Sequence, residues 1–241
     1  MANAEPTTGE LGARFARVRA QIVEAAQGCG RAADEVKLIA ISKTHPSSAV
    51  KDLIELGATD IGENRVQEAE AKIAEVGRDN VRWHLVGHLQ ANKARRAVDL
   101  FDVIHSLDSI DLARRLDRLC MEKQRKSLSV LIQVDLGHEE TKSGIEEAGL
   151  EELTETLGSL ARLQFVGLMT LPPFFENPEH SRPFFRRLRE LRDELAGRGI
   201  FGDRKGELSM GMTHDFAVAI EEGATMVRIG TAIFGERGAR H

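Results

Sequence analysis

The feature that most constrains the fold is a regular alternation between short apolar runs and longer amphipathic stretches. Apolar runs of strand length lie at 36–42, 59–62, 81–86, 102–106, 128–135, 164–169, 207–210 and 225–229. Continuous runs of this kind are typical of strands that are covered on both faces, as in a parallel sheet. The pattern therefore predicts eight parallel strands.

The stretches between these runs carry apolar residues at three- and four-residue steps, which is the period of a helix. They lie near 47–56, 65–76, 90–98, 109–125, 146–160, 178–197 and 214–222, and a further helix at about 9–27 precedes the first strand. This alternation predicts an α/β fold, a (β/α)8 TIM barrel. A doubly wound open sheet is the alternative, because the runs at 59–62 and 207–210 are weak.

Composition narrows the class of protein. The chain has 241 residues and no long linker or low-complexity tract, so we expect one domain over 1–241. The net charge of -5 argues against a nucleic-acid partner, and no apolar run is long enough for a membrane span. The polar start lacks the features of a secretory signal, and Cys29 and Cys120 lack metal-ligand spacing. We therefore expect a cytoplasmic monomer without a metal site.

Lys43 is the most informative single residue, because it follows the first apolar run directly. An amine at the carboxyl end of a buried strand is partly desolvated, which favours its neutral, nucleophilic form. Such an amine can form a Schiff base with an aldehyde. The alternative is a lysine whose amine simply reaches solvent at the end of the strand.

The loops after the last two strands combine hydroxyl groups with glycines. They contain Ser209 in one loop, and Gly230 and Thr231 in the other. Barrels often hold a phosphate between these two loops, so these three residues are the phosphate candidates. Glycines that serve turns and hydroxyls that cap helices are the structural alternative. An aldehyde site and a phosphate site together indicate pyridoxal phosphate, or the sugar phosphate of a Schiff-base aldolase.

The chain resembles the pyridoxal phosphate homeostasis protein family, single-domain relatives of the alanine racemase barrel. The stretches that carry the resemblance are 42–44, 62–68, 83–93, 142–145, 167–170, 209–212 and 227–235. Two departures are visible, because many members have tyrosine in place of Arg65 and serine in place of Thr213.

The resemblance implies that the cofactor is pyridoxal 5'-phosphate, bound covalently by Lys43 as an aldimine. It further implies that Ser209, Gly230 and Thr231 hold the phosphate and that Arg228 faces the pyridine nitrogen. Less closely defined roles also follow from it: Asn64, His84 and Met169 would line the ring pocket, and Lys142 would lie near its entrance.

The expected chemistry is binding rather than catalysis. Arginine is always protonated, so Arg228 would oppose protonation of the ring nitrogen and weaken the cofactor as an electron sink. The chain contains no tyrosine, the residue that related racemases use as one of two acid/base groups. We therefore expect a carrier that binds pyridoxal phosphate and releases it by transimination, possible acceptors being pyridoxal phosphate-dependent apoenzymes. A racemase or lyase of low activity is the alternative, in which His84, His88 or His214 would replace the tyrosine.

Overall fold

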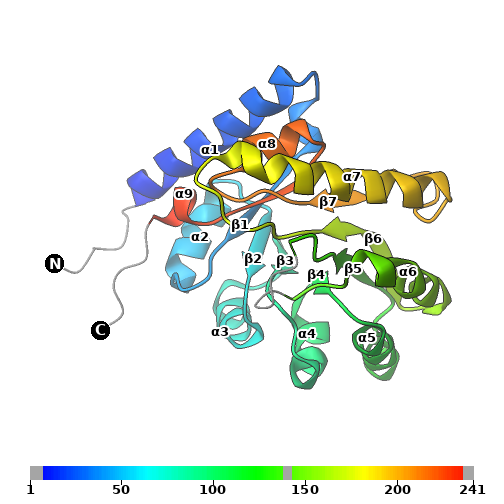
Figure 1. The fold of residues 1–241 in the computed structure, drawn as a ribbon. Helices are drawn as coiled ribbons and strands as arrows, with labels where there is room; N and C mark the ends of the chain where they lie inside the picture. Colours follow the sequence, from blue (N-terminus) through cyan, green and yellow to red (C-terminus); the bar gives the residue numbers. More distant parts are fainter. Residues whose placement is uncertain (1–7, 138–142, 236–241) are drawn as a thin grey trace.

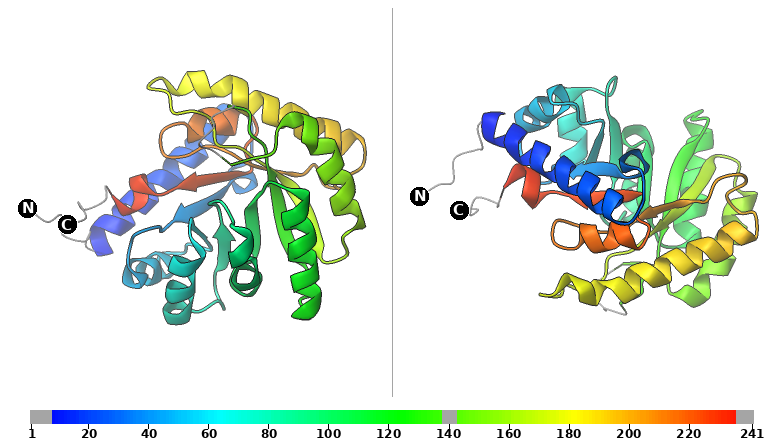
Figure 2. Two further views of the ribbon diagram at one scale, coloured as in Figure 1. Left: turned by 60° about the horizontal axis from the view of Figure 1, so that its bottom comes forward. Right: turned by 90° about the horizontal axis from the view of Figure 1, so that it is seen from above.

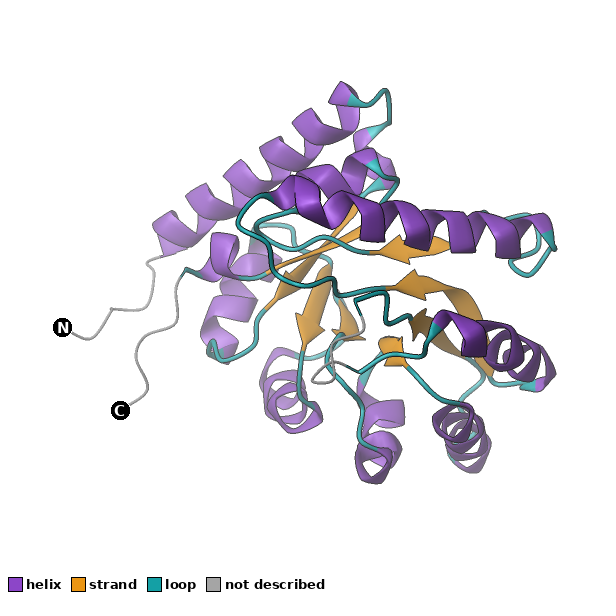
Figure 3. Ribbon diagram, in the orientation of Figure 1, coloured by secondary structure: helices purple, strands orange, loops and turns teal. Residues whose placement is uncertain are grey.

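The computed structural model describes residues 8–137 and 143–235, which form a closed barrel of parallel strands surrounded by helices (Figures 1 and 3). The strands are β1 Lys37–Ile41, β2 Asp60–Glu63, β3 Arg82–Leu85, β4 Val103–Leu107, β5 Leu128–Gln133, β6 Leu163–Met169, β7 Glu207–Ser209 and β8 Met226–Ile229. Each strand pairs with its neighbour in the chain, and β8 closes the barrel by pairing with β1. The predicted TIM barrel is confirmed, and the open sheet is wrong.

The helices of the described residues fall where the amphipathic stretches predict them, except for a short last one at 231–234 that was not predicted. They are α1 Thr8–Gly28, α2 Ser47–Glu55, α3 Val66–Val76, α4 Ala94–Leu100, α5 Ile110–Glu122, α6 Leu150–Ser159, α7 Arg182–Gly197, α8 Phe216–Glu221 and α9 Thr231–Phe234. Short 3-10 turns at Ala91–Lys93, Glu147–Gly149 and Pro178–Ser181 precede α4, α6 and α7. These three α-helices therefore begin later than the periodicity indicates, because a 3-10 turn shares most of the helical pattern.

The long first helix completes the outer ring. Helix α1 buries Leu11, Phe15, Val18, Ile22 and Ala26, which recur at three- and four-residue steps along one face. It contacts α2, α8 and α9 and lies along the outside of the barrel (Figure 2). The helix after β8, α9, has only four residues. Helix α1 therefore covers the part of the barrel wall that a longer last helix would otherwise cover.

Alternate strand residues divide the core into two regions. Residues such as Trp83, Ile104 and Val227 point outward and join the large apolar layer between sheet and helices. Inside the barrel, two small apolar groups are formed by Ile39, Ile41, Val86 and Met226, and by Val103, Leu131 and Met169. Because side chains alternate along a strand, His84, His105 and Arg228 also point inward, and all three are buried. The barrel interior is therefore partly polar.

Candidate functional site

A cavity of about 560 Å³ opens at the rim where the barrel strands end. Because the carboxyl ends of all eight strands meet at this rim, loops far apart in sequence contribute to one lining. Five of the predicted site residues line the cavity, namely Lys43, Asn64, Arg228, Gly230 and Thr231. The fold thus brings the predicted covalent lysine, the arginine and part of the predicted phosphate loops into one site.

A buried ion pair fixes the backbone just before Lys43. The hydroxyl of Ser42 and the ammonium of Lys72 both donate to the Glu63 carboxylate, and Lys72 also donates to the carbonyl oxygen of Ser42 at 2.6 Å. Burial raises the pKa of Glu63, whereas the charge of Lys72 and its hydrogen bond act in the opposite direction. These contacts join the ends of β1 and β2 and so hold the partly buried Lys43 at the rim.

Arg228 provides a buried positive charge at the floor of the cavity. Its Nη1 donates to Ser209 Oγ at 2.6 Å, and its Nη2 donates to the carbonyl oxygen of Thr170 at 2.9 Å. Burial lowers the pKa of Arg228 to about 10, although the carboxylate of Asp215 counteracts part of this effect. The guanidinium is therefore charged at neutral pH and is held in one orientation by two acceptors.

The loops after the neighbouring strands β7 and β8 both contribute to the cavity lining. Thr213 comes from the first loop, and Gly230 and Thr231 come from the second. A Cβ atom on Gly230 would lie 3.1 Å from the carbonyl oxygen of Ile41, a tighter contact than a side chain normally makes. Glycine thus lets β8 end close to β1, with two threonine hydroxyls nearby. Thr213, one of the two departures from the family pattern, was not predicted as a cofactor-binding residue but lines the cavity.

Gln133 is a lining residue that the sequence did not single out. It ends β5 and is 3% exposed, and its Nε2 donates to the carbonyl oxygen of Ser143. Its Oε1 has no hydrogen-bond partner among the described residues. A buried acceptor without a partner is costly, so a ligand that donates a hydrogen bond would satisfy it. The sequence shows only a polar residue at the end of a mainly apolar strand, and nothing local in it indicates an acceptor without a partner.

Three of the remaining predicted residues lie within the described part of the chain but not on the cavity surface. His84, Met169 and Ser209 are fully buried in the barrel interior and do not contribute to the lining. Lys142 falls in 138–142, outside the described residues. Arg65, which replaces the frequent tyrosine, has a side chain that is 69% exposed and pairs with Glu68 at 3.7 Å.

Aromatic side chains border the cavity entrance. Phe174, on the loop after β6, is 78% exposed, and its ring centroid lies 5.4 Å from that of His214. His45, on the loop after β1, also lines the cavity and stacks on Phe234, with ring centroids 4.9 Å apart. The lining therefore includes the exposed apolar ring of Phe174 and two imidazole rings besides the charged guanidinium of Arg228.

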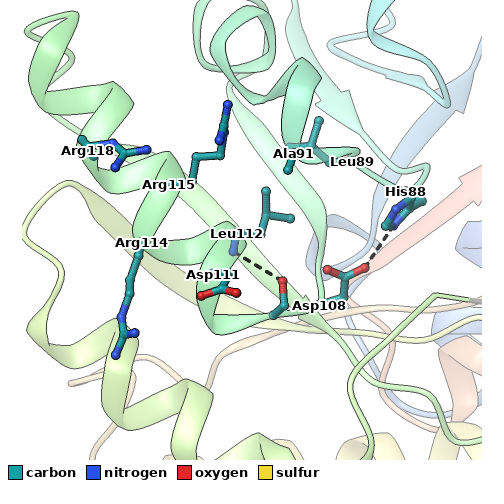
Figure 4. A pocket seen from close by; sticks show the side chains of 10 residues that line it. His88, Leu89, Ala91, Asp108, Asp111, Leu112, Arg114, Arg115 and Arg118 are labelled. Carbon is teal, nitrogen blue, oxygen red and sulfur yellow. Dashed lines mark hydrogen bonds and ion pairs between the residues drawn. The ribbon is translucent and has the colours of Figure 1, made fainter.

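A second hollow of about 490 Å³ shares His88 with the cavity. Figure 4 shows the side chains that line this hollow. His88 Nδ1 lies 3.0 Å from Asp108 Oδ2. The other charged residues that line this second hollow are Asp111, Arg114, Arg115 and Arg118. Its described lining residues carry charges of both signs but include no lysine, unlike those of the first cavity.

The described residues offer neither a metal-ligand cluster nor a membrane-spanning helix. Within 8–137 and 143–235, no group of histidine, cysteine and acidic residues is arranged to hold a metal ion. No helix in this part of the chain is long and apolar enough to cross a membrane.

Residues 16–238 match the alanine racemase N-terminal domain family. The chain is 45% identical to the pyridoxal phosphate homeostasis protein of Aquifex aeolicus over 224 residues, covering 93% of this chain and 97% of that protein. It is 40% identical over 231 residues to the Escherichia coli K12 protein of the same name, covering 95% and 97%. The chain belongs to the pyridoxal phosphate homeostasis protein family.

A solved structure of this family has the same fold. PipY of Synechococcus elongatus, with PLP bound, is 39% identical, with a TM-score of 0.81 over 93% of this chain and 100% of that one. This family membership agrees with the resemblance that the sequence motifs indicate.

Proposed function

We propose that this protein binds pyridoxal phosphate in the cavity at the barrel rim and serves in intracellular homeostasis of that cofactor. The observation that carries the proposal is the meeting of Lys43, Arg228, Gly230 and Thr231 in one lining. Its relatives bear the name of this function, and PipY has been solved with PLP bound.

The groups in the lining fit the chemistry of that molecule. Pyridoxal phosphate, when bound, supplies an aldehyde that can condense with an amine, a pyridine ring and a phosphate. Lys43 would provide the amine, and Arg228 would donate a hydrogen bond towards the ring nitrogen. Thr231 and Thr213 would offer hydroxyl donors to the phosphate, and Gly230 leaves room for its close approach. Gln133 Oε1, which has no partner among the described residues, would accept a hydrogen bond from the ligand.

We further propose that the protein carries the cofactor without using it for catalysis. Arg228 is buried and charged, so it favours an unprotonated ring nitrogen and a weak electron sink. The chain has no tyrosine to move a proton. His84 cannot replace the tyrosine, because its Nε2 contacts Asp60 and its Nδ1 contacts His105, both beneath the cavity.

The two other candidate histidines also have partners. His214 Nε2 lies 2.9 Å from the carbonyl oxygen of Glu176, so this nitrogen donates its hydrogen there. His88 pairs with Asp108 and has a side chain that is half exposed. Release would then occur when another amine displaces Lys43, and acceptor apoenzymes are the proposed recipients. We propose a monomer that acts in the cytoplasm.

Covalent trapping tests the binding proposal. The purified protein is incubated with pyridoxal phosphate, reduced with borohydride and digested, and the modified peptide is identified by mass spectrometry. We expect the pyridoxyl adduct on Lys43 and its loss in Lys43→Ala. Lys37→Ala is the matched control, because Lys37 begins the same strand at the opposite end of the barrel. A protein that stays colourless and carries no adduct would refute the proposal.

Two activity measurements separate a carrier from an enzyme. In the first, the loaded protein is mixed with a purified apoenzyme, and a parallel sample receives free pyridoxal phosphate at the same concentration. The loaded protein should activate the apoenzyme. Exchange of the α-hydrogen of alanine or serine with solvent deuterium should stay far below enzymatic rates. Exchange at enzymatic rates would replace the carrier proposal with a racemase or lyase.

A further inference from the structure

A continuous hydrogen-bonded chain crosses the interior of the barrel and ends at Arg228. Arg228 Nη1 lies 2.6 Å from Ser209 Oγ, which lies 2.9 Å from His105 Nδ1. His105 Nε2 lies 2.9 Å from His84 Nδ1, and His84 Nε2 lies 2.9 Å from Asp60 Oδ1. All five residues are less than 9% exposed. The chain runs from the first residue of β2, at the amino end of the barrel, to the floor of the cavity.

When both histidines are neutral, the state that burial favours, the two ends of this chain of hydrogen bonds dictate the direction of each one. A guanidinium can only donate and an ionised carboxylate can only accept. Asp60 therefore requires a hydrogen on His84 Nε2, which leaves His84 Nδ1 as an acceptor for His105 Nε2–H. His105 Nδ1 must then accept from the Ser209 hydroxyl, whose oxygen accepts from Arg228. Both histidines are neutral, and their burial favours that state by lowering the pKa of each.

This direction also fixes what Ser209 can do. Its single hydrogen points to His105, and its oxygen accepts from Arg228. Ser209 is absent from the lining formed by the described residues. It therefore contacts the floor of the cavity through Arg228 rather than as a direct hydroxyl donor.

We propose that Asp60, His84, His105 and Ser209 are positioning residues for Arg228, holding its guanidinium in one orientation and presenting its remaining N–H groups to the cavity. Asp60 is the remote counter-charge of the arginine, connected to it by aligned dipoles. A fully satisfied buried network is rigid, whereas a broken one leaves costly unpaired groups. The role of these residues in ligand binding rests on the proposed cofactor function, whereas the direction of the hydrogen bonds between them does not.

The direction of these hydrogen bonds can be tested in the protein without ligand. Long-range nitrogen–proton NMR correlations report which ring nitrogen of each histidine carries hydrogen. We expect His84 and His105 to be neutral at neutral pH, each with its hydrogen on Nε2. A hydrogen on Nδ1 of either residue, or a doubly protonated ring, would refute the proposed direction of the hydrogen bonds. This outcome does not depend on whether the protein binds pyridoxal phosphate.

The role towards the ligand is tested with variants of the middle of the chain. His105→Leu removes both hydrogen bonds, and we expect it to weaken pyridoxal phosphate binding about tenfold. It should also shift the ring-nitrogen NMR signal of 15N-labelled cofactor in the loaded protein. His105→Gln keeps one donor and one acceptor and should recover part of both properties. Asp60→Asn, which keeps the shape of the side chain, should give a smaller shift in the same direction.

Asp117→Leu is the matched control. Asp117 is a buried acid on α5 that accepts a hydrogen bond from the Arg162 N–H at 2.7 Å, and it belongs neither to the cavity nor to the chain. If His105→Leu and Asp60→Asn lower the unfolding temperature as Asp117→Leu does, yet leave the dissociation constant and the NMR signal unchanged, the positioning role is refuted. If His105→Leu does not fold, His105→Gln and Asp60→Asn decide the same question. Failure of the unaltered protein to bind pyridoxal phosphate would refute the proposed function instead.

Discussion

The two buried histidines make the stability of this protein depend on pH. His84 and His105 are fully buried, and burial lowers the pKa of each below 6.5, that of His105 to a greater extent. Below pH 6.5 the unfolded chain therefore binds protons that the folded protein does not. The folded state loses stability as pH falls from this value towards the folded pKa values.

The magnitude follows from the linkage relation. A histidine that stays neutral in the folded state loses about 1.4 kcal/mol of stabilisation between about pH 7.5 and about pH 5.5, so the pair together loses at most about 2.7 kcal/mol. Glu63 and Asp108 have raised pKa values and act in the opposite direction. The contributions of these two acids cancel when a histidine variant is compared with the unaltered protein.

Urea unfolding at the two pH values provides the assay. Replacing His105 with glutamine should reduce the loss of unfolding free energy by about 1 kcal/mol relative to the unaltered protein. His180→Gln is the control, because His180 is exposed on the surface. If the pH dependence of His105→Gln equals that of the unaltered protein, His105 does not stay neutral in the fold and the reasoning is wrong.

Three further predictions concern the rim and the cysteines. Gly87→Ala should lower the unfolding free energy by about 1 to 3 kcal/mol, because a Cβ atom there would meet a backbone oxygen at 2.3 Å; urea unfolding measures this, and an unchanged midpoint would contradict it. Glu63→Ala should cost about 3 to 5 kcal/mol by leaving Lys72 buried without its partner, and the pair of changes Glu63→Leu and Lys72→Met should recover much of the loss. In the native protein a thiol reagent should modify exposed Cys29 but not Cys120, which is buried and whose pKa is raised by burial. Equal labelling rates for the two thiols would contradict this difference in exposure.

Local patterns in the sequence were sufficient for the fold and for part of the site. The period of apolar residues depends on neighbours within a few positions, so strands and helices were located to within a few residues. A parallel barrel gathers the ends of its strands at one rim. Lys43 and Gly230, each just beyond a predicted strand, could therefore be expected at one site before the structure was known. The 3-10 turns before α4, α6 and α7 were not expected, because they share the helical pattern.

The tertiary structure decided which side chains reach the cavity and which support it from below. Ser209 and Thr213 lie four positions apart and both carry hydroxyls, yet only Thr213 lies in the lining. Gln133 was overlooked because its importance comes from an acceptor without a partner, which no local pattern reveals.

The hydrogen-bonded chain from Asp60 to Arg228 joins five strands, β2, β3, β4, β7 and β8. Alternation along β3 and β4 could have placed His84 and His105 inside the barrel. It could not have shown that they contact each other, because register between strands depends on closure of the whole barrel. The sequence by itself thus determined the barrel and the lysine at its rim. Only closure of the barrel decided the protonation of the histidines and the orientation of Arg228, since both depend on donors and acceptors that come from distant parts of the chain.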